Sequence, residues 1–429
     1  MAAPCVAVVG GGLAGLSAAL DLKDAGWHVE LFERSRLLGG RATSFELDGH
    51  VVDNGQHVYL ACCTEFIRFV ERAGMGSALH TQDRFDVVVY SKSGQASRLR
   101  AADLPAPFHL LASFAGYKHL PLSGKFEIAR ALLSLRLNPK SAREDLSFAQ
   151  WLRLQRQGAQ TIRSFWEPFM VPALNAPLER MNAAEAAFVI STAFLHNRGA
   201  ARFGYSTVPL AQIMDGAAAR LDRVYRSSAV FVMEADPQGI ALRTAEDELR
   251  FDAAVLAVPP RSLAKLLGEP SRFGVPALDV YEPFAIMDVH LWYEGGALDF
   301  EFAAILDSPV QWVFKKGEGY LCCSISAADE LVNKPTTDMV AVAWEEVRCA
   351  LPQLAGARLL RGAATRNPEG TYLAKPGVVR PGPATALPNL AVAGAWTATG
   401  WPDTMESAVR SGRAAAQVLL GGATSIRSI

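Results

Sequence analysis

The N-terminal pattern of apolar and polar positions predicts a strand, a tight turn, a helix and a second strand. Residues 6–9 form a short apolar run rich in valine, and residues 10–15 follow the order G-x-G-x-x-G. Residues 16–25 then have the apolar spacing of a helix, and residues 29–32 form another apolar run. This order is typical of a βαβ unit in an α/β fold.

Each glycine in this turn has a separate physical task. Gly10 permits the tight turn, Gly12 lets a pyrophosphate approach the backbone, and Gly15 lets the helix pack against the strand. The helix N-terminus then faces an anion. Glu33, eighteen residues after Gly15, can accept hydrogen bonds from ribose hydroxyls. The residues expected to contact a dinucleotide here are Gly10, Gly12, Leu13, Ala14, Gly15, Glu33 and Arg34.

The middle of the chain reads as a meander of strands. Residues 228–233, 240–242 and 251–260 are strand-like, with a turn signal near Pro237. Near the C-terminus, residues 389–394 form another apolar strand that ends in glycine, and an alanine-rich helix follows. The N-terminus of that helix would point backbone N–H donors at a partly negative oxygen.

Residues 108–137 are apolar with helical spacing, which is broken at Pro121 and Gly124. Two interpretations stay open. The segment could lie on a membrane face as an interfacial helix, or it could belong to a cap of helices that covers an active site.

Composition excludes several classes of protein. Of 429 residues, 50% are hydrophobic and 20% are charged, which is typical of a globular chain and not of a disordered one. The 42 basic and 43 acidic residues leave no basic surface for nucleic acid. Six cysteines without a CxxC pair favour a reducing cytoplasm. The eight histidines show no metal-ligand spacing, and no transmembrane helix is expected because prolines and glycines interrupt the uncharged residues 381–402.

The segment after the second strand narrows the cofactor. Residues 37–42, L-L-G-G-R-A, resemble the G-G-R extension of flavoproteins with two dinucleotide-binding domains, the class of amine oxidases and carotenoid desaturases. This resemblance implies FAD, with Arg41 at the pyrophosphate, the Val230 backbone at the adenine and the start of the last helix at the flavin. Ala395 departs from the class, in which an acidic residue normally bonds the ribityl chain.

Three further segments resemble a narrower family. Residues 51–57 contain D-N-G-Q-H, residues 165–177 contain W-x-P and A-L-N-x-P, and residues 378–411 contain A-G-x-W-T-A-T-G-x-P. Together they are similar to the squalene-associated FAD-dependent desaturases, which include the bacterial hydroxysqualene dehydroxylases of hopanoid synthesis. The further cofactor contacts that the resemblance implies are Gly40, Gly55, Gln56, His57, Gly394, Trp396, Thr404 and Met405.

The resemblance also implies the domain organisation. A Rossmann-type FAD-binding domain would be assembled from residues 1–90, 205–268 and 386–429. A discontinuous mixed α+β substrate domain would take residues 91–204, which are largely helical, and residues 269–385, which contain a sheet.

The implied reaction is the reductive removal of the hydroxyl of hydroxysqualene to give squalene, by hydride transfer from a flavin that an unidentified donor recharges. Such chemistry needs an acid at the departing oxygen and a dry apolar cavity. His57 is the first candidate for the acid, because the ordinary pKa of imidazole suits proton transfer; Glu167 and Asp403 are the rivals. Four tryptophans could line a tunnel for the long apolar isoprenoid, although core packing is the alternative for each: Trp166, Trp312, Trp396 and Trp401.

Other functions stay open. Lys315 and Lys316 are the one hint of a flavin amine oxidase, a carotenoid-type polyene desaturase is a further alternative, and a flavin-binding protein without catalysis is the last. For the preferred function we expect a cytoplasmic enzyme, with peripheral contact to the inner face of the membrane as an added expectation.

Overall fold

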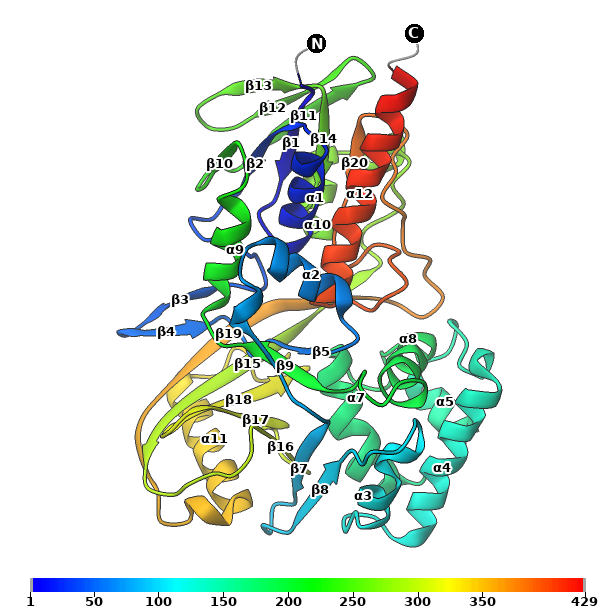
Figure 1. The fold of residues 1–429 in the computed structure, drawn as a ribbon, viewed down its shortest axis with the longest axis vertical. Helices are drawn as coiled ribbons and strands as arrows, with labels where there is room; N and C mark the ends of the chain where they lie inside the picture. The colour runs from blue at the N-terminus through cyan, green and yellow to red at the C-terminus, as the bar shows by residue number, and fades with distance from the viewer. Residues whose placement is uncertain (1–2, 427–429) are drawn as a thin grey trace.

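The computed structural model describes residues 3–426, which form an elongated molecule with two lobes (Figure 1). The first strand and the end of the last helix lie together at the far end of one lobe. The ends of the expected FAD-binding domain, residues 1–2 and 427–429, lie outside the described residues.

A five-stranded parallel sheet is the centre of the first lobe. Its strands are β1 (Cys5–Val9), β2 (His28–Phe32), β10 (Arg223–Tyr225), β14 (Ala253–Leu256) and β20 (Leu390–Val392). The order is β10-β2-β1-β14-β20, and Val6 pairs with both Val29 and Ala253. The strand–turn–helix–strand prediction is therefore confirmed, and these strands are apolar because elements cover both faces of the sheet.

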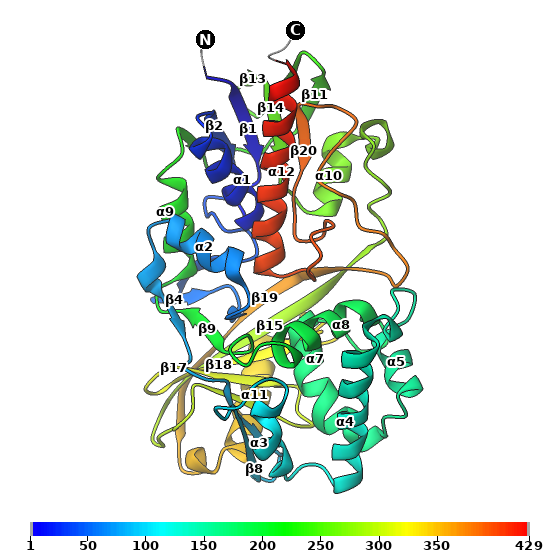
Figure 2. The same ribbon diagram turned by 45° about the vertical axis from the view of Figure 1, so that its right-hand side comes forward.

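Two helices pack against each other on one face of this sheet (Figure 2). They are α1 (Leu13–Asp24) and α12 (Met405–Ile426). Gly412 of α12 permits their close approach, because a Cβ atom there would lie 2.1 Å from the backbone oxygen of Ala14. Helix α12 is therefore held close against α1 at this point.

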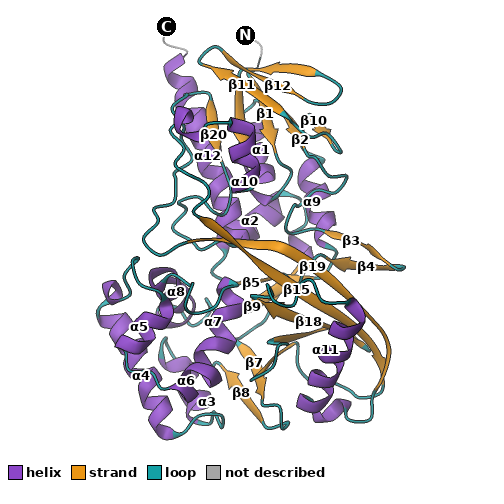
Figure 3. Cartoon of the chain, turned by 180° about the vertical axis from the view of Figure 1, so that it is seen from behind, coloured by secondary structure: helices purple, strands orange, loops and turns teal. Residues whose placement is uncertain are grey.

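An antiparallel meander covers the other side of the sheet (Figure 3). Its strands are β11 (Val232–Asp236), β12 (Gly239–Arg243) and β13 (Glu248–Phe251), with the expected turn at Pro237. The prediction of a strand from residue 228 is wrong. Ser227 has a left-handed φ of 55°, and the Ser228 N–H donates to the Glu33 backbone oxygen, so this segment first follows the end of β2.

Smaller elements complete the first lobe and lead to the second. The helices are α2 (Thr64–Arg72), α9 (Leu210–Ala218) and α10 (Pro260–Leu267), with 3-10 turns at Gly76–Ala78 and Pro270–Phe273. A hairpin joins β3 (Ser44–Leu47) to β4 (His50–Asp53). A small sheet in the order β5-β9-β6 contains β5 (Val58–Leu60), β6 (Leu79–Thr81) and β9 (Phe203–Ser206).

A seven-stranded mixed sheet is the centre of the second lobe. Its strands, in spatial order, are β19 (Arg358–Ala374), β15 (Tyr281–Glu294), β18 (Tyr320–Ser326), β17 (Trp312–Gly317), β16 (Phe302–Ile305), β7 (Asp86–Tyr90) and β8 (Ala96–Arg100). Helix α11 (Thr336–Ala350) covers one face, and a 3-10 turn at Pro352–Leu354 follows it. Met287, Val289 and Leu291 of β15 pack in the core on that face. Because side chains alternate along a strand, Asp288 and His290 lie on the opposite face.

Helices flank the other end of this sheet (Figure 3). They are α3 (Leu111–Ala115), α4 (Leu122–Leu137), α5 (Phe148–Leu154), α6 (Ala159–Thr161), α7 (Glu167–Leu174) and α8 (Ala183–Ile190), with 3-10 turns at Phe108–Leu110 and Pro139–Ser141. π-Helical segments lie at Ile162–Trp166 and Ser191–Leu195. The helical break at Pro121 is confirmed. The break at Gly124 is wrong: this glycine lies inside α4, where a Cβ atom would be 2.9 Å from Thr161 Oγ1.

The order of the segments along the chain follows the expected division into two discontinuous parts, with one difference. Strand β7, residues 86–90, pairs with β16 of the second sheet, although the sequence-based division assigns it to the first domain. The domain boundaries themselves stay a prediction. Within residues 3–426 no helix is long and apolar enough to span a membrane.

Candidate active site

The glycine turn after β1 combines tight packing at two positions with open space at the third. A Cβ atom on Gly15 would lie 1.9 Å from the backbone oxygen of Gly10, and one on Gly10 would lie 2.3 Å from that of Ala257. At Gly12 the nearest atom would be the Gly39 oxygen at 3.8 Å. The first turn of α1 has neither a capping side chain nor an acidic residue, so its N–H groups suit an anion. The turn therefore fits the pyrophosphate of a dinucleotide.

Glu33 lies at the end of β2, where the sequence predicts a ribose contact. Its buried carboxylate accepts hydrogen bonds from the N–H of Gly11 at 2.7 Å and of Ser35 at 2.8 Å. A carboxylate has about four acceptor positions, so both oxygens keep acceptor capacity for ribose hydroxyls. Arg34, beside it, is exposed.

The loop at Gly39–Arg41 joins the glycine turn to the start of the last helix. The Gly39 N–H donates to the Gly11 oxygen at 2.8 Å, and a Cβ atom on Gly40 would lie 3.5 Å from the Gly12 Cα. The Arg41 guanidinium donates to both carboxylate oxygens of Asp403, each at 2.9 Å. The backbone of this loop thus packs on the glycine turn, the Arg41 side chain is held by Asp403, and its contact with a pyrophosphate stays a prediction.

Asp403 is used as an acceptor on both of its oxygens. Besides the two bonds from Arg41, its Oδ2 accepts the Tyr372 N–H at 2.6 Å. Its side chain is only 5% exposed. This carboxylate is engaged in holding Arg41, and its role as the acid stays a prediction.

The hairpin end at residues 53–57 lies on the second lobe's sheet. Asn54 Oδ1 accepts the Thr43 N–H at 3.0 Å and lies 3.2 Å from His57 Nε2. Because an amide oxygen only accepts, His57 Nε2 is the donor of this pair. Burial, with a smaller contribution from Lys316, lowers the pKa of His57 to about 4, so its ring is neutral at pH 7. Its role as the acid also stays a prediction.

A buried polar group beneath this hairpin was missed by the sequence analysis. Asp288 is 1% exposed and its Oδ1 lies 3.6 Å from Cys322 Sγ, while Ser324 and the Gln56 backbone are further hydrogen-bonding neighbours of its carboxyl group. A Cβ atom on Gly55 would lie 3.1 Å from Asp288 Oδ2 and 3.8 Å from His57 Nε2. Burial raises the pKa of the Asp288 carboxyl to about 6. An acidic residue in the alternating apolar pattern of β15 was the signal that could have identified it.

The C-terminal cofactor candidates divide into core and site residues. The indole of Trp396 is buried, contacts Tyr281 edge to face, and donates to the Val258 backbone oxygen at 3.3 Å, which makes it part of the core. Gly394 follows β20, and its N–H donates to the Ser411 hydroxyl at 3.0 Å. The Thr404 hydroxyl accepts the Ser407 N–H at 3.3 Å, so it caps the turn in which Met405 begins α12.

Val230 and Ala395 lie near these core elements. Val230 is partly buried and packs against the cluster around β1, β14 and β20. Ala395 is buried, and its methyl side chain has no hydrogen-bonding group. The partner that the class provides for the ribityl chain is therefore missing at this position.

Glu167 lies apart from the other predicted site residues. It is exposed at the start of α7 and lines a pocket of about 330 Å³ with Arg163 and Glu179. None of the other predicted cofactor or acid residues lines this pocket. Its assignment as the acid stays a prediction without geometric support.

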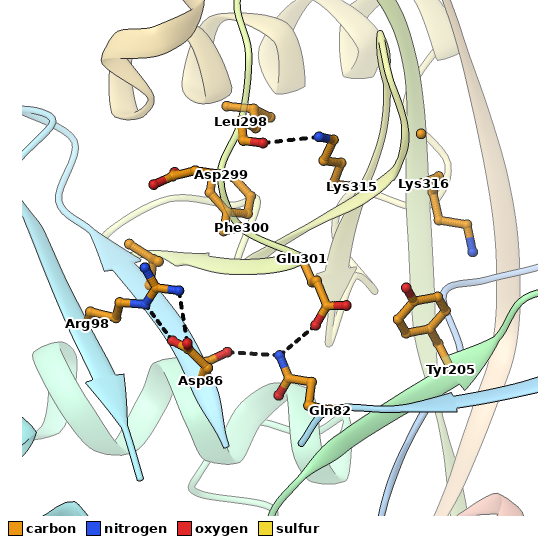
Figure 4. A pocket seen from close by; sticks show the side chains of 12 residues that line it. Gln82, Asp86, Arg98, Tyr205, Leu298, Asp299, Phe300, Glu301, Lys315 and Lys316 are labelled. Carbon is orange, nitrogen blue, oxygen red and sulfur yellow. Dashed lines mark hydrogen bonds and ion pairs between the residues drawn. The ribbon is translucent and has the colours of Figure 1, made fainter. Parts of the chain in front are cut away.

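The two lysines differ in their surroundings (Figure 4). Both line a pocket of about 540 Å³, but the Lys315 ammonium donates to the Leu298 backbone oxygen at 3.1 Å. The Lys316 side chain points away from the Lys315 ammonium, and its Nζ lies 3.8 Å from Asp53 Oδ2. Lys316 therefore contributes positive charge to the hairpin end, whereas Lys315 belongs to the pocket.

Aromatic side chains fill the space between the sheet and the helices. Trp312 donates its indole N–H to the Pro168 oxygen at 2.9 Å and lies near Phe169 and Phe203. Trp166 is buried among helices and donates to Gln157 at 2.9 Å. The guanidinium carbon of Arg410 lies 5.0 Å from the ring centroid of Trp401, and the ring centroid of Phe188 lies 5.1 Å from it. The two π-helical segments begin and end in this region, and such segments are frequent at functional sites.

One cluster with metal-ligand chemistry was not expected. Cys5, His28 and Glu30 come from adjacent strands, and their ligand atoms lie within 4.8 Å of one another. In the structure His28 Nε2 lies 3.2 Å from Glu30 Oε1. The sequence spacing could not reveal this cluster, because it forms only when β1 and β2 pair.

Comparison with known proteins agrees with this fold. The family described as flavin containing amine oxidoreductase matches residues 13–420. Hydroxysqualene dehydroxylases from Sinorhizobium fredii and Rhodopseudomonas palustris are 30% and 29% identical, over 97% of this chain and 98% of each of those proteins. A solved putrescine oxidase variant has the same fold, with a TM-score of 0.75, 20% identity and coverage of 97% of this chain and 99% of that one.

The fold and the open glycine turn define a flavoprotein oxidoreductase with FAD as its cofactor, as the sequence predicted. The chain belongs to the hydroxysqualene dehydroxylase branch of the flavin-containing amine oxidoreductase family.

Proposed function

We propose that this enzyme reductively removes the hydroxyl group of hydroxysqualene to give squalene. The observation that carries the proposal is the similarity to hydroxysqualene dehydroxylases over nearly the whole chain, 30% identity over 443 aligned residues. Similarity of that extent includes the three segments that we assign to the site: the hairpin end, the helical segment at residues 165–177 and the start of the C-terminal helix. The electron donor that recharges the cofactor is not identified.

The physical requirements of the reaction match groups that the chain brings together. Loss of the hydroxyl group of an allylic alcohol as water needs a proton at the departing oxygen, exclusion of bulk water and stabilisation of positive charge at carbon. FAD, when bound and reduced, supplies the hydride. Phe203, Phe302 and Trp312 lie against one another on the apolar side of the sheet, where aromatic faces suit both an isoprenoid chain and a cation.

For cofactor binding we propose the residues that the sequence assigned. The N–H groups at the start of α1 would hold the pyrophosphate above Gly12, and Glu33 would bind the ribose. Arg41, fixed by Asp403, would add positive charge beside the phosphates. For Trp396 only its backbone remains available, because its indole lies in the core.

We also propose peripheral contact with the inner face of the cytoplasmic membrane through α4. Ile128, Ala131 and Leu135 bury one face of this helix, yet the other face exposes apolar side chains by 54–75%: Leu122, Phe126, Leu133 and Leu137. The helix carries three basic residues and a single acidic one, Glu127, which is bonded inward to Thr161. Exposed apolar groups with basic neighbours favour an anionic bilayer, where a triterpene substrate is dissolved.

A substrate panel tests the proposed function. The purified, FAD-loaded protein is reduced without oxygen and offered hydroxysqualene, and the extracted lipid is analysed for squalene. The same protein in its oxidised form is offered putrescine, with hydrogen peroxide as the readout, and a carotenoid precursor, with new double bonds as the readout. Squalene as the one product supports the proposal, whereas peroxide from the amine or desaturation of the polyene would replace it.

A further inference from the structure

Three side chains with metal-ligand chemistry meet at the edge of the parallel sheet where β1 and β2 begin. Cys5 is the first residue of β1, and His28, the first residue of β2, pairs with it in register. Because side chains alternate along a strand, Glu30 lies on the same face of β2 as His28. We propose that these three residues bind a Zn²⁺ ion, at a site that is separate from the flavin site and independent of the proposed function.

The ligand atoms lie close to the positions that a tetrahedral ion needs. Cys5 Sγ, a ring nitrogen of His28 and a carboxylate oxygen of Glu30 all lie within 4.8 Å of one another. His28 Nε2 lies 3.2 Å from Glu30 Oε1, and two ligands at about 2.0 Å from a tetrahedral Zn²⁺ are about 3.3 Å apart. A thiolate, an imidazole and a carboxylate are all ligands that Zn²⁺ takes, and water would complete the four.

Further polar groups orient the histidine and the glutamate. Asp222 Oδ1 lies 3.6 Å from His28 Nδ1, and Asp222 Oδ2 accepts the Val29 N–H at 2.8 Å. A carboxylate at Nδ1 favours the ring proton on that nitrogen, which frees Nε2 for a metal ion, and histidine ligands almost always have such a partner. The Tyr225 hydroxyl donates to Glu30 Oε2 at 3.1 Å, which leaves Oε1 toward His28. The ligands are therefore held in place before an ion binds.

The charges at this edge of the sheet favour a divalent cation. Burial, followed by three nearby carboxylates of which Glu30 has the largest effect, raises the pKa of Cys5 to about 11. The thiol thus lies in a negative field, and a bound metal ion would displace its proton. A thiolate and a glutamate together balance the two charges of Zn²⁺. Two cations oppose it, but Lys23 is paired with Asp222, and Arg223, 3.9 Å from Glu30 Oε1, has a side chain that is 64% exposed and screened by solvent.

The cluster can be reached from solvent and is remote from the glycine turn. Cys5 is partly buried, and the side chain of His28 is 41% exposed, so an ion can enter without a change in the fold. Strand β1 leads away from Cys5 to Gly10, and five residues at about 3.3 Å each separate the two by about 16 Å. The bound ion would therefore stabilise the pairing of β1 with β2 and take no part in the flavin chemistry.

The test uses the full-length, FAD-loaded protein after metals are removed with a chelator. Co²⁺ is the spectroscopic probe, because tetrahedral Co²⁺ absorbs red light beyond the bands of the flavin. We expect one equivalent of Co²⁺ per chain to produce this absorption and one equivalent of Zn²⁺ to abolish it. Zn²⁺ should also raise the melting temperature by about 2 °C or more, because it binds the folded chain and not the unfolded one.

Two variants and a matched control distinguish this site from adventitious binding. Cys5→Ser and His28→Ala each remove one ligand, so affinity for Zn²⁺ should fall at least about tenfold and the red absorption should be lost. The control is Cys349→Ser at the exposed cysteine of α11, which should bind metal as the wild type does. The visible absorption of bound FAD shows that each variant is folded.

Either of two results would overturn the metal site. One is a wild type that shows no red absorption with one equivalent of Co²⁺, and the other is a Cys5→Ser variant that binds Zn²⁺ with wild-type affinity. Because no turnover is measured, failure of the proposed function would leave this result unchanged, and failure of the metal site would leave the proposed function unchanged.

Discussion

Arg41 and Asp403, 362 residues apart, form a two-point ion pair in which the guanidinium donates to both carboxylate oxygens at 2.9 Å. The pair connects the loop after β2 to the residues that precede α12, and it lies beside the ring of Tyr372. Two of the three segments that form the expected cofactor site are therefore fixed relative to each other by side chains and not only by the sheet.

Removal of one partner of this pair should weaken both the fold and cofactor binding. Asp403→Ala leaves a partly buried guanidinium without its acceptor, and we expect a loss of about 1–3 kcal/mol in the free energy of unfolding. FAD should bind at least several-fold more weakly, as measured by titration of its visible absorption. The exposed pair Arg143–Asp145 provides the control, since solvent screens its charges and Asp145→Ala should leave stability and FAD binding nearly unchanged. Equal effects in the two variants would contradict the positioning role.

Two glycine substitutions in the same turn should have different consequences. Gly12→Val places its side chain in open space that we assign to the pyrophosphate, so the protein should fold and lose FAD. Gly15→Val drives a side chain into the backbone of Gly10, so the protein should be strongly destabilised. Thermal unfolding and the visible spectrum of the purified variants distinguish these results. A Gly12→Val protein that is yellow with full FAD occupancy would refute the nucleotide site.

The pH dependence of stability should carry a signature of Asp288. Its pKa in the folded state, about 6, lies above the unfolded value of about 4, so the folded state binds more protons between these values. Stability from this group is therefore present below pH 4 and is lost as pH rises to 6, by about 3 kcal/mol in total. Relative to the wild type, Asp288→Asn should gain in unfolding free energy as pH rises from 4 to 7. Parallel pH curves for the two proteins would be inconsistent with a protonated buried carboxyl group.

The exposed apolar face of α4 should mediate binding to anionic vesicles. Phe126→Ser, at a side chain that is 74% exposed, should reduce co-sedimentation with vesicles that contain phosphatidylglycerol, without loss of stability. Val379 is 81% exposed on a loop elsewhere, so Val379→Ser is the matched control and should bind as the wild type does. Equal binding by all three proteins would assign α4 to the cap of helices alone.

Local patterns in the sequence predict the features that depend on neighbouring residues. The glycine turn, Glu33 and the parallel strands follow from a strand, a turn and a helix in immediate succession, and each was found where expected. Two local errors have local causes. Ser227 adopts a left-handed conformation that delays β11, and Gly124 serves close helix packing and does not end the helix.

Features that depend on distant segments could not be predicted. No spacing rule relates Arg41 to Asp403, and no local signal places the indole of Trp396 in the core. Alternation along β15 places Asp288 on one face of the sheet, but its contact with Gly55 depends on how the hairpin end packs on that sheet. The sequence motifs therefore predict the acid only among their own residues, and the buried carboxyl group of Asp288 lies outside every motif.

The most direct test of the account is a single turnover without oxygen. The FAD-loaded protein is reduced, hydroxysqualene is added, and the flavin's visible absorption is followed while the lipid is extracted. We predict reoxidation of the flavin with one equivalent of squalene formed for each flavin. A flavin that stays reduced, or that is reoxidised without squalene, would contradict the proposed function.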